Sequence, residues 1–437
     1  MGSSSPQHAE DKPRPPSATA PHDDDGAPTV LPYASGPTHA QSHPIRWFAI
    51  SLCVYAATVY GDQLRWWAIF RPTQPHHYVA QAQAWLDGRL ELNPDLKLPD
   101  LSPVDGRPYS CFSPGPTILL LVPVAILGDR IPDLLLHCLL AAGSVAFMHH
   151  ALWLIAKRTG MSLNTDTLQW LTAFFALGTI IWVNIPYRGV WFLAHWFSLA
   201  ALTAALCLSA RGWHLGAGIA WAFAFASRAP CAGALPALLY FLWSDLRRAP
   251  SRRQAWRRAA GFAVGPALMV AFMAWLNDAQ FGSPLDFGRA RMHVASVYAD
   301  RLEKGVFSTA FLADNVRAFF LDPPEWVDDP PYLISRHTGT GLFFTSPAFL
   351  CLLAAVRRNR MGGVFWLAAG LTLLPMLFYY GHESTRVGAR YLLDLYPLLF
   401  VLMMLAVGSP IRWWAKLLIA ADIAYTFCWL WYQSLRW

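Results

Sequence analysis

The stretch RRAPSRRQAWRR (residues 247–258) holds six arginines and no acidic residue, and long apolar stretches precede and follow it. In membrane proteins such basic clusters lie in the cytoplasmic loops, whereas external loops carry fewer lysines and arginines. The stretch therefore predicts a chain that crosses a membrane repeatedly, with this loop on the cytoplasmic face.

The composition of the chain agrees with this prediction. Of its 437 residues, 55% are hydrophobic and only 14% are charged, whereas a soluble domain carries about a quarter of charged residues. The net charge of +7 comes from short basic clusters between apolar runs. That pattern does not indicate a basic nucleic-acid-binding face. All cysteines except Cys111 lie in apolar runs, which predicts small buried side chains and no disulfide framework.

A helix needs about 20 apolar residues to cross a bilayer. The runs that could do so are 46–67, 131–156, 168–187, 190–209, 213–229, 231–246, 261–281, 341–356, 361–380, 391–408 and 413–432. We therefore expect an all-α polytopic membrane protein with about 11 transmembrane helices.

One further apolar run, PGPTILLLVPVAILG (residues 114–128), is short and carries internal prolines. We expect it to lie in the membrane interface or to dip into it. Counting it as a full span would place 247–258 outside, against the charge rule. Without it, the N-terminus is cytoplasmic, and the segments 68–130, 282–340 and 381–390 all face outward.

The first 44 residues are rich in Pro, Ser, Ala and Asp and contain few large apolar side chains. They predict a disordered cytoplasmic tail and show no pattern of a cleaved signal peptide. Residues 45–437 are expected to form one transmembrane domain with two external loops. The second loop, 282–340, is too long to be a simple connector.

A polar, half-apolar strip, QPHHYVAQAQAWLDGRLEL (residues 74–92), follows the first span. Its apolar residues recur at helical spacing on one face: Tyr78, Val79, Ala82, Trp85 and Leu86. This predicts an interfacial helix in the first external loop, apolar side down in the headgroup region. His76 and His77 would then face the space of a lipid headgroup or polar substrate, or be solvated surface histidines.

The order of this strip and the following DLSPVDGRPYSCFSPGPTILLLVP (100–123) resembles the first external loop of GT-C superfamily glycosyltransferases. The similarity is to bacterial members akin to the protein O-mannosyltransferase and aminoarabinose transferase group. Three later segments resemble recurring segments of such relatives: FGSPLDFG (281–288), GLFFTSPAFL (341–350) and RVGARYLLDLYP (386–397). Together they extend the resemblance over most of residues 45–410.

The resemblance implies a GT-C-like membrane domain that transfers a monosaccharide from a polyprenyl-phosphate donor. The acceptor would be a glycan, a lipid or a protein at the external face of a bacterial plasma membrane. An inverting transfer would use a carboxylate of the first external loop as general base. Basic residues or a divalent metal would hold the donor phosphate. The partners expected are the lipid-linked donor and the bilayer. No nucleotide-binding or metalloprotease motif occurs in the sequence.

Two other functions stay open. The first is a transporter or flippase of lipid-linked sugars, although no internal repeat is evident in the sequence. The second is a non-catalytic GT-C-like protein that only binds a lipid-linked glycan.

The relatives carry an acidic residue just before the His/Tyr-Tyr position, where this chain has Thr73, Gln74 and Pro75. We therefore expect the general base to lie elsewhere. Asp62, near the outer end of the first span, is favoured, because an ionisable residue at that depth is often functional. The alternative role for Asp62 is an ion pair with Arg65.

Two other residues are candidates for the base. His77 occupies the motif itself, and an imidazole titrates near neutral pH. Asp105 lies later in the loop but could equally form a turn. The residues expected to bind substrate are polar and lie near the outer edge: His76, Asp100, Arg107, Arg188, Arg228, Arg390 and Asp394.

For the arginines of this set, a guanidinium can hold a phosphodiester through two hydrogen bonds. Arg188 and Arg228 could instead extend toward the membrane surface, and Arg390 could pair with Asp394 one helical turn on. His195, within an apolar run, is expected to be a hydrogen-bonded core histidine.

Overall fold

The computed structural model describes residues 2, 40–63, 69–72, 76–292, 299–328, 332–334, 339–356, 359–381 and 388–435. Most of the predicted tail and Thr73, Gln74 and Pro75 lie outside these ranges.

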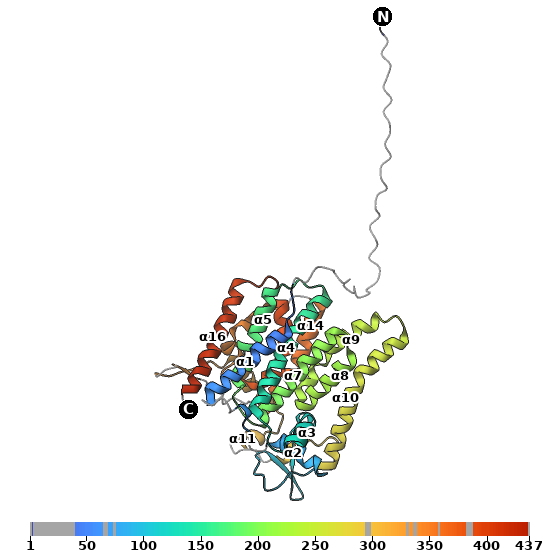
Figure 1. Cartoon of the computed structure of the whole chain (residues 1–437), viewed down its shortest axis with the longest axis vertical. Helices are drawn as coiled ribbons and strands as arrows, with labels where there is room; N and C mark the ends of the chain where they lie inside the picture. The colour runs from blue at the N-terminus through green and yellow to red at the C-terminus, as the bar shows by residue number, and fades with distance from the viewer. Residues whose placement is uncertain are drawn as a thin grey trace.

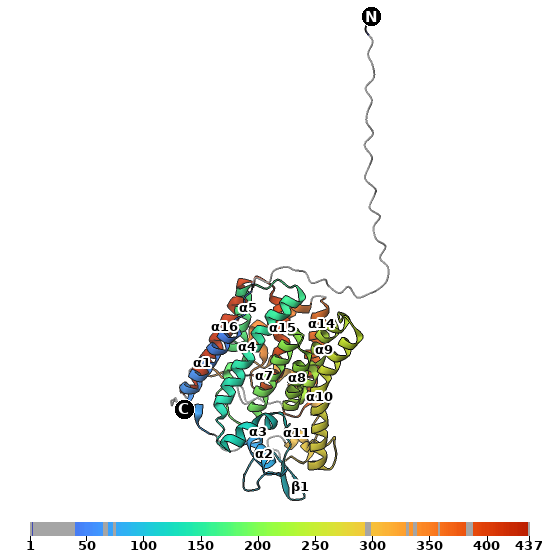
Figure 2. The same cartoon turned by 45° about the vertical axis from the view of Figure 1, so that its right-hand side comes forward.

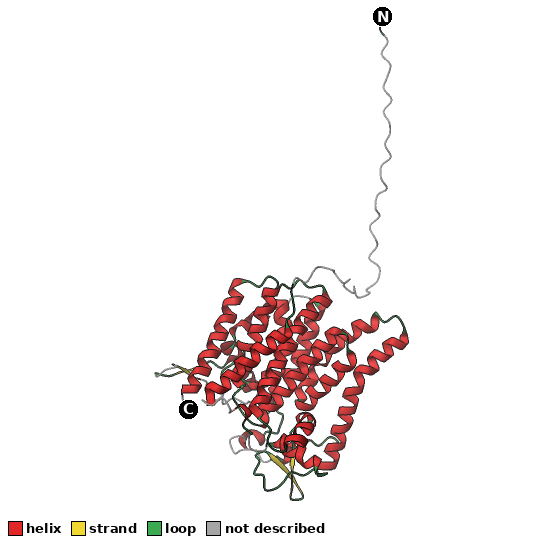
Figure 3. Ribbon diagram, viewed as in Figure 1, coloured by secondary structure: helices red, strands yellow, loops and turns green. Residues whose placement is uncertain are grey.

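Helices running side by side form the body of the molecule (Figure 3). The longer ones are α1 (Pro44–Gln63), α4 (Asp133–Thr159), α5 (Thr165–Leu177), α7 (Val190–Arg211), α8 (His214–Ser227), α9 (Leu235–Arg247), α10 (Arg252–Phe281), η7 (Pro347–Val356), α14 (Arg360–Phe378), α15 (Tyr396–Val407) and α16 (Trp413–Leu435). Short helices extend or join them: α6 (Ile180–Asn184), η2 (Ala229–Ala234), α13 (Leu342–Thr345) and η8 (Arg390–Asp394).

Within the described residues, five helical stretches are long and apolar enough to cross a membrane. They are Asp133–Thr159, Thr165–Asn184, Val190–Arg211, Arg252–Phe281 and Arg360–Phe378. The predicted class, a helical membrane protein, is therefore confirmed. The predicted number of about 11 spans stays a prediction, because several of the other helices are shorter than a bilayer-spanning helix.

Small elements gather at one end of the bundle, which we call the α2 end (Figures 1 and 2). They are α2 (His77–Leu86), α3 (Gly115–Leu127), α11 (Ala299–Leu302) and the antiparallel hairpin of β1 (Leu101–Val104) and β2 (Arg107–Ser110). The connection between α9 and α10 lies at the opposite end. The hairpin turn consists of Asp105 and Gly106, both with positive φ, as a two-residue type I′ turn requires.

The remaining short elements lie in the chain segment between α10 and α13. They are η3 (Arg289–Arg291), η5 (Thr309–Phe311), α12 (Leu312–Val316), η6 (Arg317–Leu321), β3 (Glu325–Trp326) and β4 (Leu333–Ile334). Two residues of this segment form hydrogen bonds with the C-terminal end of α14 and the residues that follow it. The Asn315 amide donates to the carbonyls of Met376, Leu377 and Tyr379, and Arg301 donates to the carbonyl of Tyr380.

The apolar run 114–128 contains α3, which packs against α2 and α8. Its 13 residues correspond to about 20 Å of helix, less than the ~30 Å hydrocarbon core of a bilayer. A Cβ at Gly115 would lie 2.7 Å from the backbone of Ala226 and Ser227, so only glycine permits this close approach to α8.

The strip 74–92 differs from the expected one-sided surface helix. In α2 the buried residues include His77, Tyr78, Gln81 and Ala84, which point to several sides of the helix. The reason is that α3 covers one side, where Thr117 donates a hydrogen bond to Gln81 at 2.7 Å, and the chain around the hairpin covers another. Both histidines are consequently buried.

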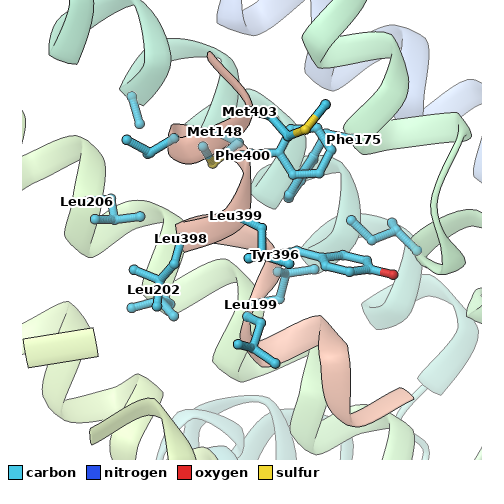
Figure 4. Packing of buried hydrophobic residues seen from close by; sticks show 14 of the residues in the cluster. Met148, Phe175, Leu199, Leu202, Leu206, Tyr396, Leu398, Leu399, Phe400 and Met403 are labelled. Carbon is cyan, nitrogen blue, oxygen red and sulfur yellow. The ribbon is translucent and has the colours of Figure 1, made fainter. Parts of the chain in front are cut away.

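Helix α15 lies in the centre of the bundle, since most of its residues are buried and they point in all directions. Figure 4 shows Phe400 of α15 beside Phe175 of α5, with ring centroids 4.8 Å apart, and Tyr396 nearby. Because η8 leads directly into α15, its polar residues Arg390 and Asp394 are also buried.

Candidate functional site

Four polar or amphipathic side chains converge at the α2 end from segments far apart in the sequence. Asp100 precedes β1, Trp191 lies in the first turn of α7, Arg289 begins η3 and Arg390 begins η8. The indole Nε1–H of Trp191 donates to the Asp100 carboxylate at 3.1 Å. Both guanidinium groups act electrostatically on Asp100. We call these four residues the arginine site.

Asp100 is held in an unusual backbone conformation. Its φ is +57°, a value that few residues other than glycine adopt. The thiol of Cys111 donates to its carbonyl oxygen at 3.6 Å. Burial raises the pKa of its carboxyl group above the ordinary value, although Trp191, Arg289 and Arg390 act in the opposite direction. Asp100 is only partly buried, so it is a reachable carboxylate of raised basicity.

Arg289 brings a positive charge close to Asp100. Its guanidinium lies over the Phe112 ring, 5.1 Å from the centroid, and its Nη1 is 3.7 Å from the sulfur of Met292. Among the residues that the structure describes, no carboxylate forms an ion pair with it. An arginine keeps its charge at any physiological pH. A half-buried guanidinium among aromatic and sulfur groups therefore attracts an anion.

Arg390 lies against aromatic faces. Its guanidinium carbon is 5.0 Å from the ring centroid of Phe192, 5.7 Å from that of Tyr391 and 5.8 Å from that of Trp191. Phe192 and Trp191 belong to the first turn of α7, and a helix N-terminus carries a partial positive charge. The arginine site thus combines two guanidinium groups with the positive end of a helix.

Asp394 is fully buried and forms an ion pair with Arg228, whose side chain is partly buried. Arg228 Nε donates to Asp394 Oδ2 at 3.0 Å, while Oδ1 accepts from Ser198 at 2.8 Å and lies 3.1 Å from His195 Nδ1. The Arg228 guanidinium also lies 5.0 Å from the Tyr391 ring centroid. The sequence left open an ion pair between Asp394 and Arg390. Asp394 instead pairs with Arg228 at the end of α8 and contacts His195 and Ser198 of α7. Charge compensation of this kind is what a buried carboxylate requires.

The two adjacent histidines are both engaged in hydrogen bonds. His76 caps α2 by accepting from the backbone N–H of Tyr78, and it pairs with Asp133 at 3.0 Å. His77 Nε2 lies 2.5 Å from the Pro99 carbonyl oxygen, and Nδ1 lies 3.3 Å from Ser110 Oγ. Burial lowers the pKa of His77 to about 4, so its ring is neutral at physiological pH.

The other predicted site residues lie elsewhere. Asp105 and Arg107 are exposed at the hairpin turn, and at 3.3 Å per residue Asp105 is about 16 Å along the strand from Asp100. Arg188 is partly buried in the connection between α6 and α7. Asp62 belongs to α1, but its side chain lies outside the described part of the chain, so its role stays a prediction.

Arg289 and Trp191 were not predicted from the sequence. Arg289 directly follows the segment FGSPLDFG, and Ser102 of β1 donates to the carbonyl of Gly288 at 2.8 Å. Gly288 has a φ of +69°, and a Cβ there would meet the Phe281 ring at 2.4 Å. The glycine therefore allows the turn that brings Arg289 to the hairpin.

The residues available for a metal ion are few at this site. Within the described ranges, no group of three or more His, Cys, Asp or Glu side chains could hold a metal ion. The basic residues of the arginine site are Arg289 and Arg390.

No protein family model matches this chain, and no curated protein matches it either. Among solved structures, it is similar to the apo crystal structure of the Archaeoglobus fulgidus oligosaccharyltransferase. The sequence identity is 14% and the TM-score is 0.46, with 89% of this chain and 56% of that chain covered. The chain thus spans little more than half the length of that protein.

Proposed function

We propose that this chain is an integral-membrane glycosyltransferase that moves a monosaccharide from a polyprenyl-phosphate donor to a hydroxyl group of its acceptor. The observation that carries the proposal is the position of Arg289, a half-buried guanidinium that acts electrostatically on Asp100 but forms no ion pair with a described carboxylate. The order of segments in the sequence, which resembles GT-C glycosyltransferases, indicates the same class of reaction. The acceptor would be a glycan, a lipid or a protein.

Arg289 and Arg390 would bind the donor phosphate. A guanidinium offers parallel N–H groups that match two phosphate oxygens. The N-terminus of α7, to which Trp191 and Phe192 belong, adds donors and positive potential on the same side. The site lies at the end of a bundle of apolar helices (Figure 2), a position where a lipid phosphate would meet the protein while its chain stays in the bilayer.

Asp100 would be the general base. In the transfer, the acceptor oxygen forms a bond to the anomeric carbon while the bond from that carbon to the phosphate oxygen breaks. The lipid phosphate leaves with the bonding electron pair, and the arginines stabilise its charge. Asp100 takes the proton of the acceptor hydroxyl. A single displacement of this kind inverts the configuration at the anomeric carbon.

Asp62, the base favoured from the sequence, has no described side chain and stays an untested candidate. The other two candidates, His77 and Asp105, suit this role less well. Both ring nitrogens of His77 are engaged with protein groups, and Asp105 is at the hairpin turn. The raised pKa of Asp100 makes it a better proton acceptor than an ordinary aspartate. Asp100 and Arg390 were both predicted to bind substrate, and the proposal changes the role of the first.

For the topology, we propose a cytoplasmic tail and a cytoplasmic 247–258 stretch. The α2 end, with its two long loops, would then face outward in a bacterial plasma membrane. The support is the gathering of arginines at the end where α9 meets α10, opposite the α2 end (Figure 1).

The test is turnover by the purified protein in nanodiscs with a panel of radiolabelled polyprenyl-phosphate sugars. We expect the parent protein to use at least one donor. Asp100→Asn should bind that donor with unchanged affinity and transfer it about 10²–10⁴-fold more slowly. Binding without turnover by the parent protein would instead indicate a non-catalytic binding protein. Movement of the labelled lipid across liposomes without transfer would indicate a flippase.

A further inference from the structure

His77 contacts both the chain segment that leads to Asp100 and the aromatic ring that packs against Arg289. On one side its Nε2 lies 2.5 Å from the carbonyl oxygen of Pro99, the residue before Asp100. On the other side its ring meets the Phe112 ring edge-on, with centroids 4.7 Å apart and planes at 71°. Phe112 is the ring that supports Arg289. The His77 imidazole thus lies between Pro99, which precedes the proposed base Asp100, and Phe112, the ring that packs against Arg289.

The hydrogen bonds determine which nitrogen of His77 carries the proton. A carbonyl oxygen only accepts, so Nε2–H donates to Pro99, and the unprotonated Nδ1 accepts from the hydroxyl of Ser110. Ser110 Oγ in turn accepts from the backbone N–H of Phe112. Because both nitrogens are used and His77 is 1% exposed, the imidazole has no lone pair to offer a substrate hydroxyl.

The backbone of Asp100 needs support of this kind. Its left-handed φ of +57° is disfavoured for a residue with a Cβ, so neighbouring contacts must stabilise it. Two bonds bracket the residue: His77 Nε2–H to the carbonyl before it, and the Cys111 thiol to its own carbonyl. The third contact, from Trp191, orients the carboxylate itself.

We infer that His77 is a positioning residue, which fixes the Pro99 carbonyl and thereby aims the Asp100 carboxylate into the arginine site. The inference rests on the proposed function, since it assumes that Asp100 is the base. The charged and titratable groups that face Asp100 are Arg289 from η3, Arg390 from η8 and Cys111 after β2. Those that face His77 are His76 and Arg289.

The kinetic test compares His77→Ala with His77→Gln, using the donor identified by the turnover panel. Glutamine places an amide N–H and an amide oxygen near the positions of the two imidazole nitrogens, but it cannot act as a base at neutral pH. We expect His77→Ala to lower kcat about 10- to 100-fold with an unchanged donor KM. His77→Gln should recover most of that loss. Equal inactivity of both variants would show that His77 is itself the base, and parental kcat in His77→Ala would show that it positions nothing.

The pH profile separates positioning from general support of the fold. Asp100 must be ionised to accept a proton, and burial raises its pKa. In His77→Ala the released carboxylate should become more hydrated, so the acidic limb of kcat should move to lower pH. A lower kcat with an unmoved limb in both variants would contradict the inference.

The inference can also be tested without a substrate, by the reactivity of Cys111. This test applies even if the protein turns over no donor. Cys111 is buried and bonded to the Asp100 carbonyl, whereas Cys53 and Cys428 are exposed. In a Cys53→Ser/Cys428→Ser background, iodoacetamide should alkylate Cys111 at least several-fold faster in His77→Ala than in the parent. His77→Gln should restore the slow rate. An unchanged rate in His77→Ala would overturn the inference, whatever becomes of the proposed function.

Discussion

The indole N–H of Trp191 donates to the carboxylate of Asp100 across 3.1 Å, which joins the first turn of α7 to the segment entering β1. The same indole lies 5.8 Å from the guanidinium carbon of Arg390. One side chain of a membrane helix therefore contacts both the proposed base and a proposed phosphate ligand.

Trp191→Phe should separate these two contacts. Phenylalanine keeps an aromatic face for Arg390 but removes the N–H that orients Asp100. A hydrogen bond to a charged group contributes about 1.5–3 kcal/mol, so we expect kcat to fall about 10- to 100-fold with donor affinity nearly unchanged. The measurements are kcat and the donor dissociation constant. A loss of donor affinity at constant kcat would assign Trp191 to the phosphate instead.

Asp100→Asn should make the protein more stable at neutral pH, or leave its stability unchanged, while it removes the base. The pKa of Asp100 is raised in the folded state, so folding favours the protonated form. The unfavourable contribution to stability is absent below the unfolded-state pKa and develops as pH rises through the folded-state pKa. The difference in Tm between Asp100→Asn and the parent should therefore shrink between pH 7 and pH 4. A variant markedly less stable at pH 7 would contradict this.

Breaking the buried pair should destabilise the protein strongly. Asp394 is fully buried, and Arg228 loses its partner when Asp394 is replaced by leucine. An unpaired buried charge costs about 3–5 kcal/mol, so Asp394→Leu should lower Tm markedly in detergent. Arg228→Met/Asp394→Leu should recover part of the loss. As a control, disruption of the surface pair of Arg89 and Asp87, 2.8 Å apart, should change stability by less than about 1 kcal/mol.

Cysteine labelling of intact cells tests the proposed topology. Ser251 lies between α9 and α10, and Asp105 lies at the hairpin turn; both are exposed. In a Cys53→Ser/Cys428→Ser background, a membrane-impermeant maleimide should label Asp105→Cys from outside and should not label Ser251→Cys. The reverse labelling pattern would show that the protein has the opposite orientation in the membrane, with the arginine site on the cytoplasmic face.

The helical membrane class was predictable because long apolar runs and basic clusters are local properties of the sequence. The surroundings of α2 were not. The spacing of Tyr78 and Trp85 predicts one apolar face, but whether His77 meets solvent depends on α3 and the hairpin, which fold back over α2. Helical periodicity gives no information about such a covering segment.

The same limit explains why only part of the site was predicted from the sequence. Asp100, Arg390 and Asp394 stood out as polar residues near apolar runs, whereas Arg289 looked like one of several charges in a long loop. Its importance comes from the bond of Ser102 to Gly288, which joins residues 186 positions apart. A pairing over that distance is a tertiary contact, and local sequence patterns do not report it.

Donor binding by two neighbouring arginine variants tests the central claim most directly. Arg289 and Arg291 belong to the same short helix, but Arg291 is paired with Asp286 at 2.6 Å. The measurement is the dissociation constant for polyprenyl phosphate in nanodiscs, for the parent, Arg289→Ala and Arg291→Ala. We expect Arg289→Ala to weaken binding about 10- to 100-fold, as the loss of a charged hydrogen bond would, and Arg291→Ala to bind like the parent. Equal affinity in all three proteins would contradict the assignment of the arginine site to the donor phosphate.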